Sequence, residues 1–387
     1  MITSGFTYLA TILFIAGIIV LLDKTYQNLF KHLPGVVLLY FIVMLCTTFG
    51  LWQQSPDVKL YYKMVKDAAI PCMIFLMLLR CDLRKIAKLG PKMLIGFFSA
   101  TLTICTGFIV TYGLLKNQFE PEFWKPLSTL CGSWIGGTGN MAAVQGALQV
   151  PDAKMGNVLL MDSVCYGIWV MFLLAIVPYA RYFNKWTHAD TRLIDEVGAK
   201  LKQEQLSATG QVDFSSLFLL LGTSLFVSAA CQNLAASEYI PKTQFLSTST
   251  WAILFVTLAG TLCALTKMGQ IPGASPLSNI MLYTIIGLYG SQANFRELTQ
   301  APFYIAAGFM IMAIHAGLMV ALARIFKLDL FTCGVASLAN IGGAASAPIL
   351  AAAYSEVLIP IGVLMALLGY LVGTQGGLIV GKILSMI

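Results

Sequence analysis

The sequence predicts an all-α polytopic membrane protein with two inverted repeats, about ten crossing helices and two broken, re-entrant Gly-Gly hairpins. Three observations predict it: an apolar composition, twelve apolar stretches along the 387 residues, and motifs of the first half that recur in the second. Hydrophobic residues make up 58% of the chain and charged residues 11%, whereas soluble domains carry roughly 25% charged residues. Such a chain cannot cover a water-facing surface. A cytosolic enzyme, a secreted protein and a nucleic-acid reader are therefore excluded, and the lipid bilayer is the expected surrounding.

The apolar stretches divide evenly around one polar segment. A helix that crosses a bilayer needs about 20 apolar residues. The stretches are 5–22, 33–52, 68–80, 91–115, 126–149 and 155–180, then 214–234, 245–266, 276–291, 301–325, 330–354 and 357–385. We therefore divide the chain into a first repeat (1–181), a cytoplasmic connector (182–213) and a second repeat (214–387). Leu193, Val197 and Leu201 in the connector recur every four residues, which favours a short helix on the membrane surface, although a solvated connector is the simpler interpretation.

Short motifs recur at nearly constant offsets. The matched motifs are Asp82-Leu83-Arg84 with Asn294-Phe295-Arg296 and Gly96-Phe97 with Gly308-Phe309, both 212 positions apart, then Ile135-Gly136-Gly137 with Ile341-Gly342-Gly343 at 206, and Leu160-Met161 and Tyr166 with Leu364-Met365 and Tyr370 at 204. The changes of offset fall in loops, where a true repeat would place its deletions. The pattern indicates an internal duplication.

The positive charges favour inverted halves. If 126–149 and 330–354 enter the bilayer and return, ten helices cross and the two repeats have opposite orientations. Most of the 24 Lys and Arg residues, including those of the basic loops 80–92 and 181–202, then lie on the cytoplasmic side. If all twelve stretches crossed, the halves would be parallel and the charge bias weaker.

The two returning segments carry paired glycines. Glycine pairs interrupt helices, and the peptide groups that they free must face protein or a watery cavity. We expect Asn140 and Ser346 to cap the helices that follow, with Pro348 in the first turn. Two half-helix N-termini would then meet near the midplane, an arrangement that suits an anionic group and marks transporter binding sites. The predicted substrate-binding residues are Gly136, Gly137, Thr138, Gly139, Asn140, Asn340, Gly342, Gly343 and Ser346. The alternative is close packing through small residues.

Asp162 is the deepest carboxylate of the apolar stretches, and its repeat partner is Ala366. Ionisable residues inside spans are costly and mark ion or proton pathways, so we expect Asp162 to be the coupling site for Na⁺ or H⁺. The alternative is a structural partner for a neighbouring polar group.

His315 is expected to pack between helices rather than to relay protons. Glycines at every fourth position of the last stretch, from Gly369 to Gly381, predict a close neighbouring helix. The nine cysteines show no metal-ligand spacing and are expected to be buried thiols.

The first Gly-Gly hairpin, Asp162 and the run 339–343 resemble the YjcL-like family of uncharacterised integral membrane proteins. More distantly, the chain is similar to sodium:glutamate symporters, 2-hydroxycarboxylate symporters and the bile-acid and cation/proton antiporter group. The resemblance implies a transport domain of broken helices that moves against a scaffold domain. It departs from the antiporters at Asp162, which is followed by Ser163 where those proteins pair two acids.

Together these observations predict a secondary active transporter of a small anionic or zwitterionic organic solute, coupled to Na⁺ or H⁺ by alternating access. A passive channel or facilitator is the alternative, and an intramembrane enzyme is disfavoured because HExxH and GxSxG motifs are absent from the sequence. No cofactor beyond the coupling ion is expected, and the site of any bound Na⁺ would lie near Asp162. A homodimer is a possible assembly, although no sequence motif requires it. The expected location is a bacterial inner membrane.

Overall fold

The computed structural model describes residues 1–26, 35–190, 211–243, 246–293 and 301–387, which fold into α-helices and short 3₁₀ turns. The helices are α1 (Gly5–Thr25), α3 (Gly35–Thr48), α4 (Pro56–Leu78), α5 (Leu83–Ala87), α6 (Gly90–Leu115), α7 (Trp124–Gly136), α8 (Thr138–Leu148), α9 (Met155–Ile176), α10 (Ala180–Thr187), α12 (Phe214–Ala236), α13 (Thr248–Ala264), α14 (Ala274–Gly290), α15 (Ala301–Phe326), α16 (Leu330–Ile341), α17 (Gly343–Tyr354) and α18 (Ile359–Leu384). Extended pairing in this part of the chain is limited to one isolated bridge between Ile2 and Trp52.

Six helical segments among the described residues are long and apolar enough to cross a membrane. They contain α1, α6, α9, α12, α15 and α18. Large apolar side chains on these helices face outward, as at Leu102 of α6 and Phe226 of α12, which are 63% and 74% exposed. Because water would not tolerate so much exposed apolar surface, the protein is an integral membrane protein. The helices α3 and α13 are also apolar but shorter.

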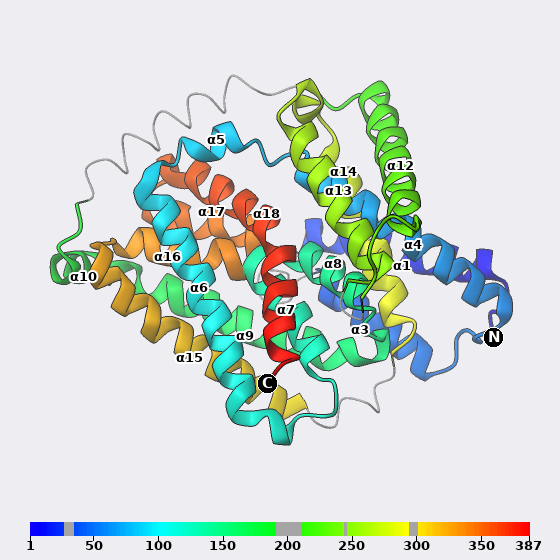
Figure 1. Cartoon of the computed structure of the whole chain (residues 1–387), viewed down its shortest axis with the longest axis horizontal. Coiled ribbons are helices and arrows are strands. Elements are labelled where there is room, and N and C mark those ends of the chain that lie inside the picture. The colour runs from blue at the N-terminus through cyan, green and yellow to red at the C-terminus, as the bar shows by residue number, and fades with distance from the viewer. Residues whose placement is uncertain (27–34, 191–210, 244–245, 294–300) are drawn as a thin grey trace.

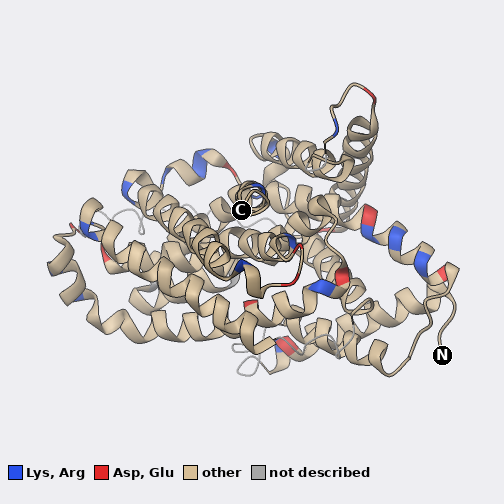
Figure 2. Cartoon of the chain, turned by 60° about the horizontal axis from the view of Figure 1, so that its bottom comes forward, with Lys and Arg blue, Asp and Glu red and all other residues tan. Residues whose placement is uncertain are grey.

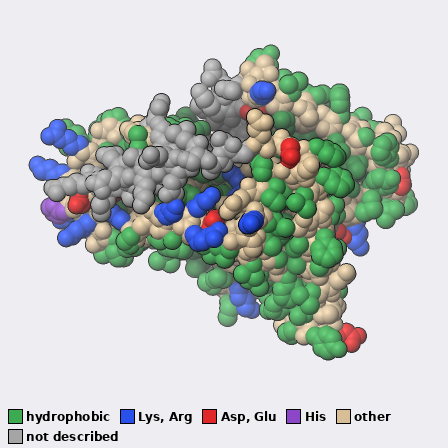
Figure 3. Space-filling view, turned by 90° about the horizontal axis from the view of Figure 1, so that it is seen from above, with side chains coloured by type: hydrophobic (Ala, Val, Ile, Leu, Met, Phe, Trp, Pro, Cys, Tyr) green, Lys and Arg blue, Asp and Glu red, His purple; other side chains and the backbone are tan. Residues whose placement is uncertain are grey.

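Helix α4 differs from the stretch that the sequence predicts. Hydropathy marks only 68–80, whereas the helix begins at Pro56. Ser55 caps it by accepting a 3.2 Å hydrogen bond from the amide of Val58, and Pro56 fits the first turn. The N-terminal half of α4 is too polar to appear in a hydropathy scan. Outside α4, the ribbon in Figure 2 is coloured for charged residues mostly at helix ends and in connections. Figure 3 shows hydrophobic side chains over much of one face.

The helices form two packed groups (Figure 1). The first, which we call the α4 group, contains α1, α3, α4, α12, α13 and α14. The second, the hairpin group, contains α6 to α9 and α15 to α18. Contacts between the groups are made chiefly by α8, which packs against α4 and α13. The arrangement leaves room for a site between the groups.

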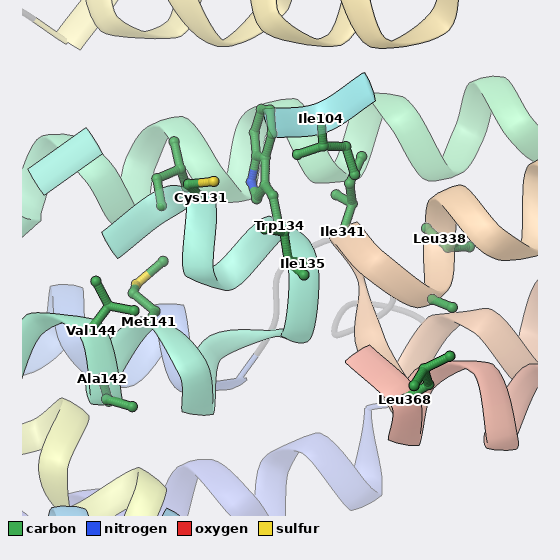
Figure 4. Packing of buried hydrophobic residues seen from close by; sticks show 14 of the residues in the cluster. Ile104, Cys131, Trp134, Ile135, Met141, Ala142, Val144, Leu338, Ile341 and Leu368 are labelled. Atoms are coloured by element: carbon green, nitrogen blue, oxygen red, sulfur yellow. The ribbon is translucent and has the colours of Figure 1, made fainter. Parts of the chain in front are cut away.

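Each Gly-Gly segment turns back on itself. In the first hairpin, a β-carbon at Gly132 of α7 would lie 2.8 Å from Cγ2 of Val144 on α8, so the two helices run side by side. In the second, the rings of Phe331 at the start of α16 and Tyr354 at the end of α17 lie 5.3 Å apart. Figure 4 shows buried apolar side chains on both hairpins, among them Trp134 of α7, Val144 of α8 and Leu338 of α16.

Helix α18 packs closely on α7 through its glycines. A β-carbon at Gly377 would lie 3.0 Å from both the Cα of Gly132 and the carbonyl oxygen of Ser128. This confirms the prediction that the glycine stripe serves a close neighbouring helix. The nine cysteines are free thiols. Six are buried, as predicted, whereas Cys46, Cys105 and Cys263 are partly exposed. The amphipathic pattern at Leu193, Val197 and Leu201 and the motif at 294–296 lie outside the described residues.

Candidate functional site

The tips of the two hairpins meet. Gly137 ends the α7 turn with φ +86°, and Gly343 opens α17 with φ +60°. Both angles are in the left-handed region, which glycine adopts readily because it has no β-carbon. A β-carbon at Gly343 would lie 3.8 Å from the Cα of Gly137, and one at either glycine would lie 3.7 Å from Cε1 of Tyr370. Tyr370 of α18 therefore stands beside both tips.

The helices after the tips begin earlier than the sequence predicts. We expected Asn140 and Ser346 to be the N-caps, but α8 begins at Thr138 after Gly137, and α17 begins at Gly343 after Gly342. Gly137, the cap of α8, has the positive φ that glycine adopts readily. Gly342, the cap of α17, has a negative φ, but a β-carbon there would lie 2.6 Å from Cε2 of Tyr166, so only glycine fits. Pro348 consequently lies inside α17 rather than in its first turn.

The two asparagines of the motifs anchor helices. Asn140 donates from Nδ2 to the carbonyl oxygen of Tyr370 at 3.0 Å and to the hydroxyl of Thr374 at 3.1 Å, which ties the first tip to α18. Asn340 accepts a 2.8 Å hydrogen bond from Thr101 of α6 and donates to the carbonyl oxygen of Ala336. Both asparagines are buried.

A cavity of about 560 Å³ lies between the α4 group and the hairpin group. Six of the predicted substrate-binding residues line it, namely Gly137, Thr138, Gly139, Gly342, Gly343 and Ser346. The remaining three, Gly136, Asn140 and Asn340, lie behind this lining. Gly136 packs against the backbone of Gly369. The structure thus brings both tips to one cavity.

Asp162 borders the same cavity from α9. Its Oδ1 accepts a 2.7 Å hydrogen bond from the indole Nε1 of Trp134, and its Oδ2 accepts one from the hydroxyl of Ser133 at 3.4 Å. Both donors belong to α7, so the carboxylate is held against the first hairpin. It keeps a half-buried position with access to the cavity. Buried ionisable groups of this kind are costly and usually functional.

Sequence reasoning missed several polar residues of the cavity. Arg80 lies just beyond the end of α4, and Asp23 and Tyr283 come from α1 and α14. Tyr166 and Tyr370 also line it, and their matched positions in the two repeats were a signal that could have found them. Within the described ranges no carboxylate forms an ion pair with Arg80.

His315 lies elsewhere and binds neighbouring helices. Its Nδ1 is 2.7 Å from the hydroxyl of Thr103 on α6, and its Nε2 is 2.8 Å from that of Ser337 on α16. It is 1% exposed and does not line the cavity. In the described part of the chain no group of three or more His, Cys, Asp or Glu side chains could hold a metal ion.

The fold and the cavity define a polytopic integral membrane protein with an internal site between two helix groups. The chain belongs to the family described as "protein of unknown function (DUF819)", whose model matches residues 10–387. It is similar to the "uncharacterized membrane protein YjcL" of Bacillus subtilis (strain 168), with 24% identity over 336 residues, which cover 83% of each chain. The family assignment agrees with the resemblance that the hairpin motifs indicate.

Proposed function

We propose that this protein is a secondary active transporter of a small organic solute that carries a carboxylate, coupled to Na⁺ or H⁺. The observation that carries the proposal is the cavity between two helix groups, where the tips of two broken hairpins meet beside Asp162. Cavities of 300–1,000 Å³ are typical of small-molecule sites. Broken helices in matching positions of the two halves of a transporter point to its binding site.

The lining of the cavity supports inverted repeats. Four of its residues on α14 are Ser278, Asn279, Leu282 and Tyr283. Their counterparts 212 positions earlier are Lys66, Asp67, Ile70 and Pro71, which all line a second cavity of about 540 Å³. The two cavities are thus related through the same offset that relates the sequence motifs.

The ends of α6 support opposite entry of the two hairpins. Lys92 near its start lies 3.6 Å from Asp329, which precedes α16. Lys116 after its end donates a 2.8 Å hydrogen bond to the terminal residue Ile387, and the first hairpin follows shortly after. The two hairpins therefore enter from opposite ends of the bundle.

The hairpins differ in how they meet the α4 group, which supports alternating access. The first hairpin is docked: Thr250 of α13 donates a 2.9 Å hydrogen bond to the carbonyl oxygen of Ala147 on α8. The second, formed by α16 and α17, packs mainly on α18 and α6, and the cavity separates it from α14. An exchange of these two arrangements would close the first cavity and open the second.

The charges around the cavity support a carboxylate solute. The first turns of α8 and α17 present N–H groups that lack intrahelical acceptors and carry partial positive charge. Arg80 adds a guanidinium, whose planar fork matches a carboxylate. Asp162 can then serve the coupling ion, either by protonation or as one oxygen ligand of Na⁺.

Gradient-driven uptake tests the proposal. Purified protein in proteoliposomes would be given pooled labelled amino acids, organic acids and sugar acids under an imposed Na⁺ or H⁺ gradient. We expect accumulation above equilibrium, abolished by Asp162→Asn and retained by the matched control Glu122→Gln, which neutralises an exposed carboxylate. Flux that only equilibrates, and that ignores Asp162, would show a passive facilitator instead.

A further inference from the structure

The second cavity lies where the first hairpin meets the α4 group. It is bordered by the end of α8, the middle of α4, the end of α12 and the start of α13. Its polar lining includes Lys66, Asp152, Gln145, Gln149, Gln232 and Asn233. None of these residues lines the first cavity.

An ion pair joins the two helix groups at this cavity. The Nζ of Lys66 on α4 lies 3.2 Å from Oδ1 and 3.3 Å from Oδ2 of Asp152, which follows α8. Tyr62 of α4 donates its hydroxyl to the same carboxylate, and Lys66 donates to that hydroxyl at 3.0 Å. Gln145 of α8 donates a 2.7 Å hydrogen bond to Oδ1 of Asp152. We call these four residues the latch.

The latch is only partly open to its surroundings. The side chain of Lys66 is 22% exposed and that of Asp152 is 10% exposed. Separating such a pair leaves each charge desolvated without its partner, which is strongly unfavourable. At the repeat-related position of the first cavity stands Ser278, so the ammonium group of Lys66 has no counterpart at that position.

We propose that the second cavity is the opposite-facing access site for the carboxylate solute, in which Lys66 binds the solute carboxylate and Asp152 holds that place while the first hairpin is docked. This proposal rests on the proposed transport function. When the hairpin leaves α4, Asp152 leaves with it and Lys66 loses its counter-ion. A solute carboxylate restores the lost pairing, so the solute itself favours opening of the latch.

The remaining lining fits a polar solute. Gln232 and Asn233 of α12 present amide groups to the cavity. Gln145 is 1% exposed, and its Oε1 has no hydrogen-bond partner among the described residues. This oxygen can accept a hydrogen bond from a hydroxyl or ammonium group of the bound solute.

Charged thiol reagents can probe this site without knowledge of the solute. Ser249 of α13 lines the cavity, and its hydroxyl accepts a 3.3 Å hydrogen bond from Gln149, the residue that follows α8. Ser249→Cys therefore reports whether the hairpin is docked. The full chain in lipid nanodiscs would be treated with an anionic and a cationic thiosulfonate, and modification of residue 249 followed by peptide-resolved mass spectrometry. Ser215→Cys serves as the reactivity control, because Ser215 is exposed at the start of α12 and does not line this cavity.

We expect slow modification in the Ser249→Cys parent. Asp152→Asn should raise the rates and favour the anionic reagent about fivefold, because it faces an unpaired ammonium. Adding Lys66→Gln should keep the higher rates and abolish the preference. The charge swap Lys66→Asp with Asp152→Lys should restore slow modification, which shows that the variants fold.

Two results would overturn the proposal: rates that Asp152→Asn leaves unchanged, or a reagent preference that does not depend on Lys66. The labelling does not require transport. If it behaves as expected while gradient-driven uptake fails, the anion-binding site stands and the transport function is wrong. If uptake succeeds and the labelling does not respond, the transport function stands and the latch is wrong.

Discussion

The indole Nε1 of Trp134 donates a 2.7 Å hydrogen bond to Oδ1 of Asp162. The donor lies on α7 of the first hairpin and the acceptor on α9, so the contact fixes the carboxylate relative to the hairpin tips. The indole ring also packs edge-on against Phe108 at 5.4 Å. Trp134 therefore positions Asp162 from a buried, rigid place in the core.

Trp134→Phe should weaken ion coupling more than folding. It removes the donor but keeps an aromatic ring in the core, and a hydrogen bond to a charged group contributes about 1.5–3 kcal/mol. We expect the coupling-ion concentration for half-maximal uptake to change by about tenfold or more, while the protein still purifies as a folded species. An unchanged ion dependence of uptake would show that this hydrogen bond does not position the coupling site.

Gly343→Ala should strain the second tip. Space is available, since a β-carbon would first meet Tyr370 at 3.7 Å, but φ of +60° is unfavourable for alanine, by about 1–2 kcal/mol. We expect lower thermal stability and slower uptake. Gly222→Ala in α12 is the matched control, because its β-carbon meets nothing within 4 Å and φ is helical. Equal thermal shifts for the two variants would argue against strain at the tip.

Gly377→Ala should disrupt the packing of α18 on α7. Its β-carbon would lie 3.0 Å from the Cα of Gly132, and such overpacking costs about 1–3 kcal/mol. We expect a lower melting temperature in detergent. Gly317→Ala in α15, where the β-carbon has open space, should leave the melting temperature unchanged or slightly raised. A Gly377→Ala protein as stable as this control would contradict the close contact.

Asp82 should contribute stability that depends on pH. It caps α5, and the Arg84 guanidinium donates two 2.9 Å hydrogen bonds that hold the pKa of Asp82 below its ordinary value. A lowered pKa means that the contribution is complete above the ordinary carboxyl pKa and is lost as pH falls through the folded-state value. Because asparagine also caps helices, Asp82→Asn isolates the charge. The difference in melting temperature between wild type and Asp82→Asn should shrink from pH 7 to pH 3, and a difference that stays constant would refute the assignment.

Much of the architecture follows from hydropathy and glycine pairs. The apolar stretches correspond to helices, and the pairs at 136–137 and 342–343 mark the two tips, because lipid forbids exposed backbone and positive φ demands glycine. Hydropathy does not predict the polar N-terminal half of α4. This half is stabilised by the Ser55 cap and by the tertiary contacts of Lys66, which a hydropathy scan does not detect.

The site was only partly accessible from the sequence. Asn140 was expected at a helix start, yet its amide turns to α18, a contact between residues 230 positions apart that no local pattern contains. Arg80 stands at the end of an apolar stretch like many membrane arginines, and only the assembled helices place it in the cavity. The contacts of Asn140 and the position of Arg80 therefore depend on long-range packing, which local sequence patterns do not contain.

Alternating access requires the second hairpin to dock on the α4 group when the first hairpin leaves it, and one distance tests this most directly. In the docked first hairpin, a β-carbon at Gly146 would lie 3.4 Å from Cδ1 of Ile70; the repeat-related positions in the second hairpin and α14 are Ala352 and Leu282. Spin labels at Ala352 and Leu282 in nanodiscs would be measured by pulsed electron paramagnetic resonance with and without Na⁺ and at two pH values. We predict two distance populations whose ratio responds to the coupling ion, with the shorter one representing a docked second hairpin. A single distance that no ion or pH alters would contradict alternating access.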